Sequence, residues 1–201
     1  MPAFSQPVFD MQRVFRVVLD AMSRPARLCR LPVFPQSVPD GLSPVLADLA
    51  LTPVRRRISA LAFLRACGRM KRQRGSVSTA AVRSSEEADK AAFALVADAS
   101  ELPPLSAFAQ GVPAYPDRSA TVLLAGLAFD AGTRFRGSGP GICGESTFTC
   151  TLPEDFAGRW RENTSGFPLG VDMLLCGADG VAGLPRTTRL ERLPQESASC
   201  M

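Results

Sequence analysis

Residues 171–185 read VDMLLCGADGVAGLP, and this stretch predicts a pair of buried strands joined by a tight turn. Two short apolar runs, VDMLLC and VAGLP, lie on either side of GADG, an arrangement that is typical of a β-hairpin. Asp172 stands inside the first run, where a buried carboxylate needs a partner. Arg186, directly after the hairpin, is a candidate for that partner, either in a structural ion pair or in a catalytic one.

The segments before the hairpin alternate between helical and strand-like patterns. Apolar residues at steps of three and four predict a helix over about residues 8–23, closed by Pro25. Its stripe consists of Met11, Val14, Phe15, Val18, Leu19 and Met22. Strands are expected within 26–33, 93–98, 119–129, 133–137 and 146–152, helices within 43–51 and 153–163, and a helical turn within 84–91. This order predicts one α/β domain over residues 1–201, with a mixed sheet flanked by helices.

Composition excludes several classes of protein. The chain has 201 residues, of which 46% are hydrophobic, so it can bury a sizeable core. It has neither a cationic leader before an apolar run nor a run near the roughly 20 apolar residues of a membrane span. We therefore expect a soluble, cytoplasmic protein with no membrane partner.

The residues that are missing narrow the chemistry further. No histidine occurs, which removes Ser-His and Cys-His nucleophile pairs and histidine metal ligands. The six cysteines show no CxxC spacing, so we interpret them as scattered reduced thiols and expect no metal site. The two lysines, Lys71 and Lys90, leave almost no candidate for Schiff-base chemistry.

Gly139, Gly141 and Gly144 match the letters of a GxGxxG motif. Dinucleotide binding needs a helix directly after the glycines, but the residues that follow, ESTFTCTL, form a β-like run. A tight turn in which glycine adopts positive φ is the better interpretation.

Arginines and hydroxyls near this turn and after the hairpin are candidates for binding an oxyanion. Arg134 and Arg136 flank the turn, and Arg186, Thr187 and Thr188 follow the hairpin. Guanidinium forks with neighbouring hydroxyls suit phosphate or phosphonate oxygens. The alternative is that these arginines form surface or interface ion pairs.

Several longer stretches together resemble one known family. GSGPGI, FPLGVDMLLC and LPRTT, in this order and spacing, resemble the H subunit of the bacterial carbon–phosphorus lyase system, which breaks down alkylphosphonates. PVFDMQRVFRVVLDAMSRP and FALVADASELPPLSAFAQGVPAYPDRSATVLL look like the same family. The resemblance covers most of the chain on both sides of residues 53–83.

The resemblance implies a fold similar to the large domain of pyridoxal-phosphate-dependent transferases, without the cofactor. It also implies a homodimer that joins the G, I and J subunits in a core complex. In that system ATP and alkylphosphonate are the substrates, and the I subunit, with G, H and L, forms ribose 1-alkylphosphonate 5-triphosphate. The resemblance assigns no catalytic residue to the H subunit. It therefore leaves Arg136, Gly139, Gly141, Asp172, Arg186, Thr187 and Thr188 as candidates for binding substrate or partner.

Residues 55–75, RRRISALAFLRACGRMKRQRG, do not fit the rest of the chain. They hold 8 of its 23 Lys and Arg residues and no acid. The wider segment 53–83 holds 9, which leaves 14 basic and 19 acidic residues elsewhere. The net charge of +4 therefore comes from this one segment.

The family resemblance also stops in this segment. One choice of synonymous codons for RGSVSTAAVR, residues 74–83, gives WLRFHSGCP when read from the third base, close to a WLRFHTGAP pattern of the family. PVRRRISALAF, residues 53–63, similarly permits LFDAESALWL in another frame. We therefore hypothesise that residues 53–83 are translated out of frame.

Three functions remain open, the first from the resemblance and the other two from the residues themselves. The first is an accessory subunit of a phosphonate-processing complex, inactive alone. The second is a free-standing enzyme for a small molecule that uses Asp172 and the arginines. The third is a nucleic-acid-binding module that uses residues 55–75, whose basic residues suit phosphate backbones although Phe63 is their one aromatic neighbour.

Overall fold

The hairpin expected over residues 171–185 is present in the computed structural model, which describes residues 7–31, 61–64, 89, 91–178 and 180–194. Its strands are β7 (Asp172–Gly177) and β8 (Gly180–Leu184), paired antiparallel. They belong to a six-stranded sheet with the order β1-β8-β7-β4-β3-β2. The other strands of this sheet are β1 (Leu28–Arg30), β2 (Leu61–Leu64), β3 (Phe93–Val96) and β4 (Thr121–Leu127).

Strand directions confirm the mixed α/β sheet. Strands β2, β3, β4 and β7 run parallel, whereas β8 is antiparallel to both of its neighbours. A second, antiparallel sheet has the order β6-β5-β9 and consists of β5 (Thr133–Ser138), β6 (Ser146–Cys150) and β9 (Arg189–Arg192).

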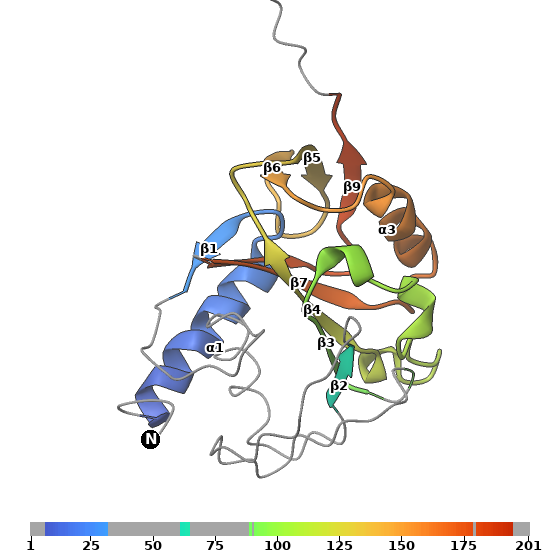
Figure 1. Cartoon of the computed structure of the whole chain (residues 1–201). Helices are drawn as coiled ribbons and strands as arrows, with labels where there is room; N and C mark the ends of the chain where they lie inside the picture. The colour runs from blue at the N-terminus through green and yellow to red at the C-terminus, as the bar shows by residue number, and fades with distance from the viewer. Residues whose placement is uncertain (1–6, 32–60, 65–88, 90, 179, 195–201) are drawn as a thin grey trace, which may run out of the picture.

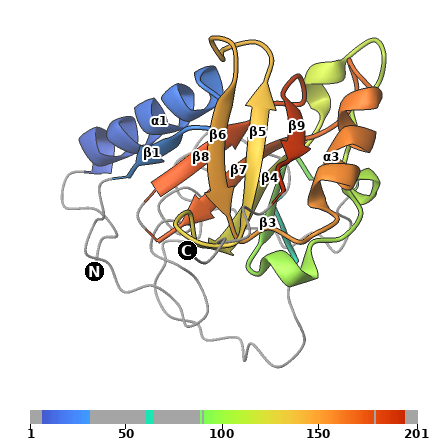
Figure 2. The same cartoon turned by 90° about the horizontal axis from the view of Figure 1, so that it is seen from above.

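Helices and the smaller sheet cover opposite faces of the main sheet. Helix α1 (Pro7–Ser23) lies against one face, and α3 (Phe156–Ser165) and the three-stranded sheet lie on the other (Figure 1). The view from above shows β5, β6 and β9 stacked over the main sheet, with α3 beside them (Figure 2). Three short 3-10 helices, η2 (Ala99–Glu101), η3 (Leu105–Ala107) and η4 (Pro116–Arg118), lie between β3 and β4.

The alternation of side chains along β4 divides the core in two. Leu123 and Ala125 pack in the layer beneath α1, whereas Val122 and Leu124 pack in the layer that contains Trp160 and Phe135. A strand in the middle of such a sheet is buried on both faces, which is why these strands are continuous apolar runs in the sequence.

The predicted helix over residues 8–23 is confirmed, but its apolar stripe is only partly buried. Val14 is buried, and Met11, Val18 and Met22 pack against the sheet. Phe15 and Leu19 belong to the predicted stripe, yet they are 53% and 52% exposed. A helix that touches one sheet face buries a limited arc, and residues about 100° around the axis from that contact lie outside it.

Several sequence predictions fall on residues that the structure does not describe. These are the helix within 43–51, most of the helical turn within 84–91, and the anomalous segment 53–83 except for β2. The out-of-frame hypothesis and the nucleic-acid arm at residues 55–75 therefore stay predictions. Within the described parts of the chain, no helix is long and apolar enough to cross a bilayer.

Candidate functional site

The topology brings three separate segments to one edge of the main sheet. Thr121 at the start of β4 is opposite Asp172 at the start of β7, because these strands are parallel. Leu184 at the end of antiparallel β8 is opposite Met173. Asp172, Arg186 and the residues just before β4 must therefore lie close together.

Asp172 and Arg186 form the ion pair that their positions suggested. Arg186 Nε donates to Asp172 Oδ1 at 3.1 Å, and Nη2 donates to Oδ2 at 2.6 Å. The backbone amide of Arg186 also donates to Asp172 Oδ1, at 2.8 Å. The Arg186 and Asp172 side chains are 13% and 21% exposed, so water screens this bidentate pair only weakly.

The remaining donors of Arg186 hold two loops. Its Nη1 donates to the carbonyls of Pro116, at 2.9 Å, and Pro168, at 3.3 Å, while Nη2 also donates to the hydroxyl of Ser119. A guanidinium has five N–H groups. All five have acceptors inside the protein, so an oxyanion could bind Arg186 only by displacing one of them.

The glycines of the GxGxxG-like stretch form a turn, as predicted. Gly139 has φ +130° and Gly141 has φ +85°. A Cβ on Gly139 would meet the Thr187 carbonyl oxygen at 2.9 Å, and one on Gly141 would meet the Ser23 carbonyl oxygen at 2.4 Å. The turn is followed by strand β6 rather than by a helix, which removes the helix N-terminus that a dinucleotide site requires.

Thr187 and Thr188 connect the two sheets. Thr188 is fully buried, and its carbonyl oxygen accepts a 2.8 Å hydrogen bond from Trp160 Nε1. Its Oγ1 has no hydrogen-bond partner among the described residues. The backbone of Thr187 packs against Gly139, so both threonines lie at packing contacts of the fold.

Arg136 lies apart from this cluster, on β5. Its guanidinium contacts the carboxylates of Glu191, at 2.5 Å, and Glu145, at 3.5 Å. The hydrogen bond from Arg136 lowers the pKa of Glu191 below its ordinary value. Arg136 therefore forms an exposed ion-pair network, which was the alternative to oxyanion binding for this arginine.

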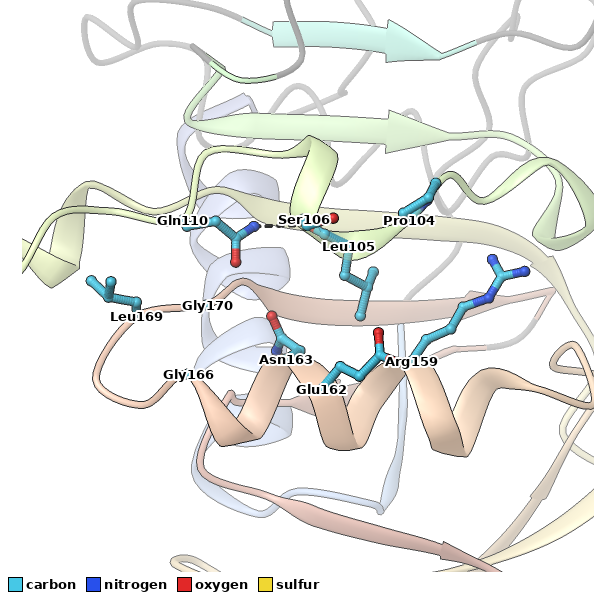
Figure 3. Close-up of a pocket in the computed structure, with 10 residues that line it drawn as sticks. All are labelled: Pro104, Leu105, Ser106, Gln110, Arg159, Glu162, Asn163, Gly166, Leu169 and Gly170. Carbon is cyan, nitrogen blue, oxygen red and sulfur yellow. Dashed lines mark hydrogen bonds between the residues drawn. The ribbon is translucent and has the colours of Figure 1, made fainter.

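A pocket that the sequence did not indicate lies between α3, the loop that follows it and the segment 104–110. It has a volume of about 480 Å³ and is lined by Pro104, Leu105, Ser106, Gln110, Arg159, Glu162, Asn163, Gly166, Leu169 and Gly170 (Figure 3). Asn163 anchors the loop, since its amide donates to the Val171 carbonyl and its Oδ1 accepts from the Val171 amide. These contacts join residues from distant segments, so no local sequence pattern could have identified the pocket.

Three of the four described cysteines are buried, which disfavours the thiolate form that a reactive cysteine needs. Cys29, Cys150 and Cys176 are buried free thiols, and Cys143 is exposed. Burial raises the pKa of Cys150 to about 12 and raises the pKa of Cys176 as well. Among the described residues, no group of three or more His, Cys, Asp or Glu side chains could hold a metal ion.

The described part of the chain is thus an α/β protein. Its Asp172–Arg186 ion pair stabilises the fold and does not combine a nucleophile with a general base. The family model described as "Bacterial phosphonate metabolism protein (PhnH)" matches residues 2–191, and the chain belongs to this family. A Rhizobium meliloti (strain 1021) relative, "Alpha-D-ribose 1-methylphosphonate 5-triphosphate synthase subunit PhnH", is 32% identical over 204 residues, covering 94% of each chain. A Stutzerimonas stutzeri protein, "Putative C-P lyase subunit protein HtxG", is 36% identical over 78 residues, covering 37% of this chain and 39% of that one.

Proposed function

We propose that this chain is an accessory subunit of the carbon–phosphorus lyase core complex. In this role it is needed to form ribose 1-alkylphosphonate 5-triphosphate from ATP and alkylphosphonate. The proposal rests mainly on the similarity to the synthase subunit along 94% of the chain. It includes a homodimer, assembly with the G, I and J subunits, and a cytoplasmic location.

The contacts of the candidate residues favour an accessory role over independent catalysis. Arg186 and Asp172 hydrogen-bond to each other in a bidentate ion pair. Gly139, Gly141 and Thr188 lie at tightly packed positions. We propose that these residues shape the edge of the sheet that partners or substrate meet, and that none performs a chemical step alone.

The proposed function also includes a fold and the absence of a bound cofactor. We propose one domain over residues 1–201, similar to the large domain of pyridoxal-phosphate-dependent transferases, with no cofactor bound. A pyridoxal site requires a Schiff-base lysine, and the two lysines of the chain, Lys71 and Lys90, lie outside the described residues.

Reconstitution tests the proposed function. The sibling subunits are mixed with ATP and methylphosphonate, with and without this chain, and adenine release and the phosphorus NMR spectrum are followed. We expect product only when the chain is present, and none from the chain alone. Equal product formation without the chain contradicts an accessory role, and turnover by the isolated chain supports a free-standing enzyme instead.

A further inference from the structure

The pocket beside α3 contains polar groups that the fold itself does not use. It is separate from the set of side chains that hydrogen-bond to Arg186, although the loop 166–170 borders both. Figure 3 shows Gln110 and Arg159 on opposite sides of the pocket, with Leu105 between them. The chemistry of the pocket therefore depends on which of its donors and acceptors are still available.

Most hydrogen-bond donors around the pocket already have acceptors. The amides of Gly166, Leu169 and Gly170 donate to the carbonyls of Asn163, Gly166 and Gln110. Arg159 donates through Nε to Asp155 Oδ2 at 2.7 Å and through Nη1 to the Leu102 carbonyl at 2.9 Å. These contacts occupy several of the donors that could otherwise hold a phosphate or phosphonate group.

Two acceptors, in contrast, remain open. Gln110 Nε2 donates to the carbonyls of Leu105 and Phe108, at 2.7 and 2.8 Å, so the amide oxygen must be turned away from them. Figure 3 shows this oxygen directed into the pocket. The Glu162 carboxylate has neither an ion pair nor a hydrogen bond with any described residue. The open groups thus favour a ligand that carries N–H donors and positive charge.

Part of the lining is apolar and consists of Leu105, which is 4% exposed, Leu169 and Pro104. Lysine and arginine side chains have this combination, because an alkyl stem that packs on apolar surface carries a cationic head. We propose that the pocket receives a lysine or arginine side chain from a partner polypeptide, with its head group at Glu162 and Gln110.

The surface next to the pocket supports a polypeptide as the source of that side chain. Phe167, Tyr115 and Val112 are 62%, 51% and 50% exposed. Phe167 lies two residues before Leu169, Val112 lies two residues after Gln110, and Arg186 Nη1 joins the loops through Pro116 and Pro168. Exposed apolar groups on loops that also contribute to a pocket are typical of a protein interface.

The choice of a sibling subunit as partner rests on the proposed function, but the pocket can be tested independently of it. The probe is n-butylguanidinium, titrated into the full chain while NMR follows the Gln110 side-chain amide and the amides of Gly166 and Gly170. We expect saturable shifts, and affinity at least about fivefold lower in Glu162→Gln, which removes the charge and keeps the shape. The absence of saturable shifts in the unmodified chain overturns the pocket as a cation site.

Assembly with the sibling subunits tests the partner. Glu162→Lys is compared with Asp130→Lys, an equal charge reversal at an exposed residue that follows the opposite end of β4. We expect Glu162→Lys to weaken association about tenfold, and Asp130→Lys to change it less than twofold. Thermal unfolding of both variants checks that each is folded.

The outcomes separate the two proposals. If the probe binds but Glu162→Lys assembles as well as the unmodified chain, the pocket serves a free alkyl cation and the partner interpretation is wrong. If the unmodified chain joins no sibling, the accessory function fails and so does the partner. The n-butylguanidinium titration still decides whether the cation pocket exists.

Discussion

Replacing Arg186 with alanine removes the side chain that joins the starts of β4 and β7. The change takes away three contacts to the Asp172 carboxylate and Ser119 and two to the carbonyls of Pro116 and Pro168. The Asp172 carboxylate would keep the hydrogen bond from the backbone amide of residue 186. A carboxylate that is 21% exposed would then lack its countercharge.

The magnitude follows from this burial. Breaking a buried pair by removing one partner typically costs about 3–5 kcal/mol. Because water reaches part of Asp172, we expect the lower end, a loss of about 3 kcal/mol in the free energy of unfolding. With a urea dependence of about 2 kcal/mol per molar, the midpoint moves down by about 1.5 M.

The assay is urea unfolding followed by the fluorescence of Trp160, the single tryptophan, which is fully buried. Arg186→Lys keeps the charge, but a single ammonium cannot reach all five acceptors. Its urea midpoint should therefore fall between those of the unmodified chain and Arg186→Ala. Arg136→Ala is the matched control, because it removes an arginine from an exposed ion-pair network, and it should leave the midpoint unchanged. If Arg186→Ala changes the urea midpoint as little as Arg136→Ala does, Arg186 does not stabilise the fold by joining these segments.

Further predictions concern the turn, the core, the thiols and the basic segment. Gly144→Ala should cost about 1 kcal/mol from positive φ alone, and Gly141→Ala clearly more, because its Cβ would also meet the Ser23 carbonyl oxygen; urea midpoints compare the two, and equal losses contradict the contact. Trp160→Phe should cost about 1–3 kcal/mol, since it leaves the buried Thr188 carbonyl without its donor, and circular dichroism during unfolding measures this loss. The pKa of Cys150 is raised from 9.0 to about 12, so its stabilising contribution is complete below about pH 9 and is lost as pH rises toward 12; urea midpoints should fall above about pH 9, with a shallower slope in Cys150→Ala. Resequencing the DNA for residues 50–90 should reveal base errors whose correction restores a WLRFH-like segment, whereas confirmed bases count against the out-of-frame hypothesis.

The periodicity of the chain was enough to predict most of its described helices and strands, although it did not indicate β2. Steps of three and four residues located α1, and continuous apolar runs located β3, β4, β7 and β8, because local burial patterns are written in consecutive residues. The stretches GSGPGI, FPLGVD and PRTT were also sufficient to identify the family that the comparisons then established.

The state of the candidate residues could not be predicted in the same way. An ion pair between Arg186 and Asp172 fits both a structural and a catalytic role. What the sequence did not show is that the carbonyls of Pro116 and Pro168 and the hydroxyl of Ser119 accept the remaining hydrogens of Arg186. Backbone carbonyls have no sequence signature, and they reach Arg186 only because parallel pairing places the starts of β4 and β7 side by side. The pocket at Gln110 and Glu162 depends likewise on the packing of α3 against a segment about fifty residues away in the chain. The order of residues along the chain therefore determined most of its helices and strands and its family. The pairing of distant segments determined which polar groups are hydrogen-bonded and which remain open, because hydrogen bonding depends on proximity in space.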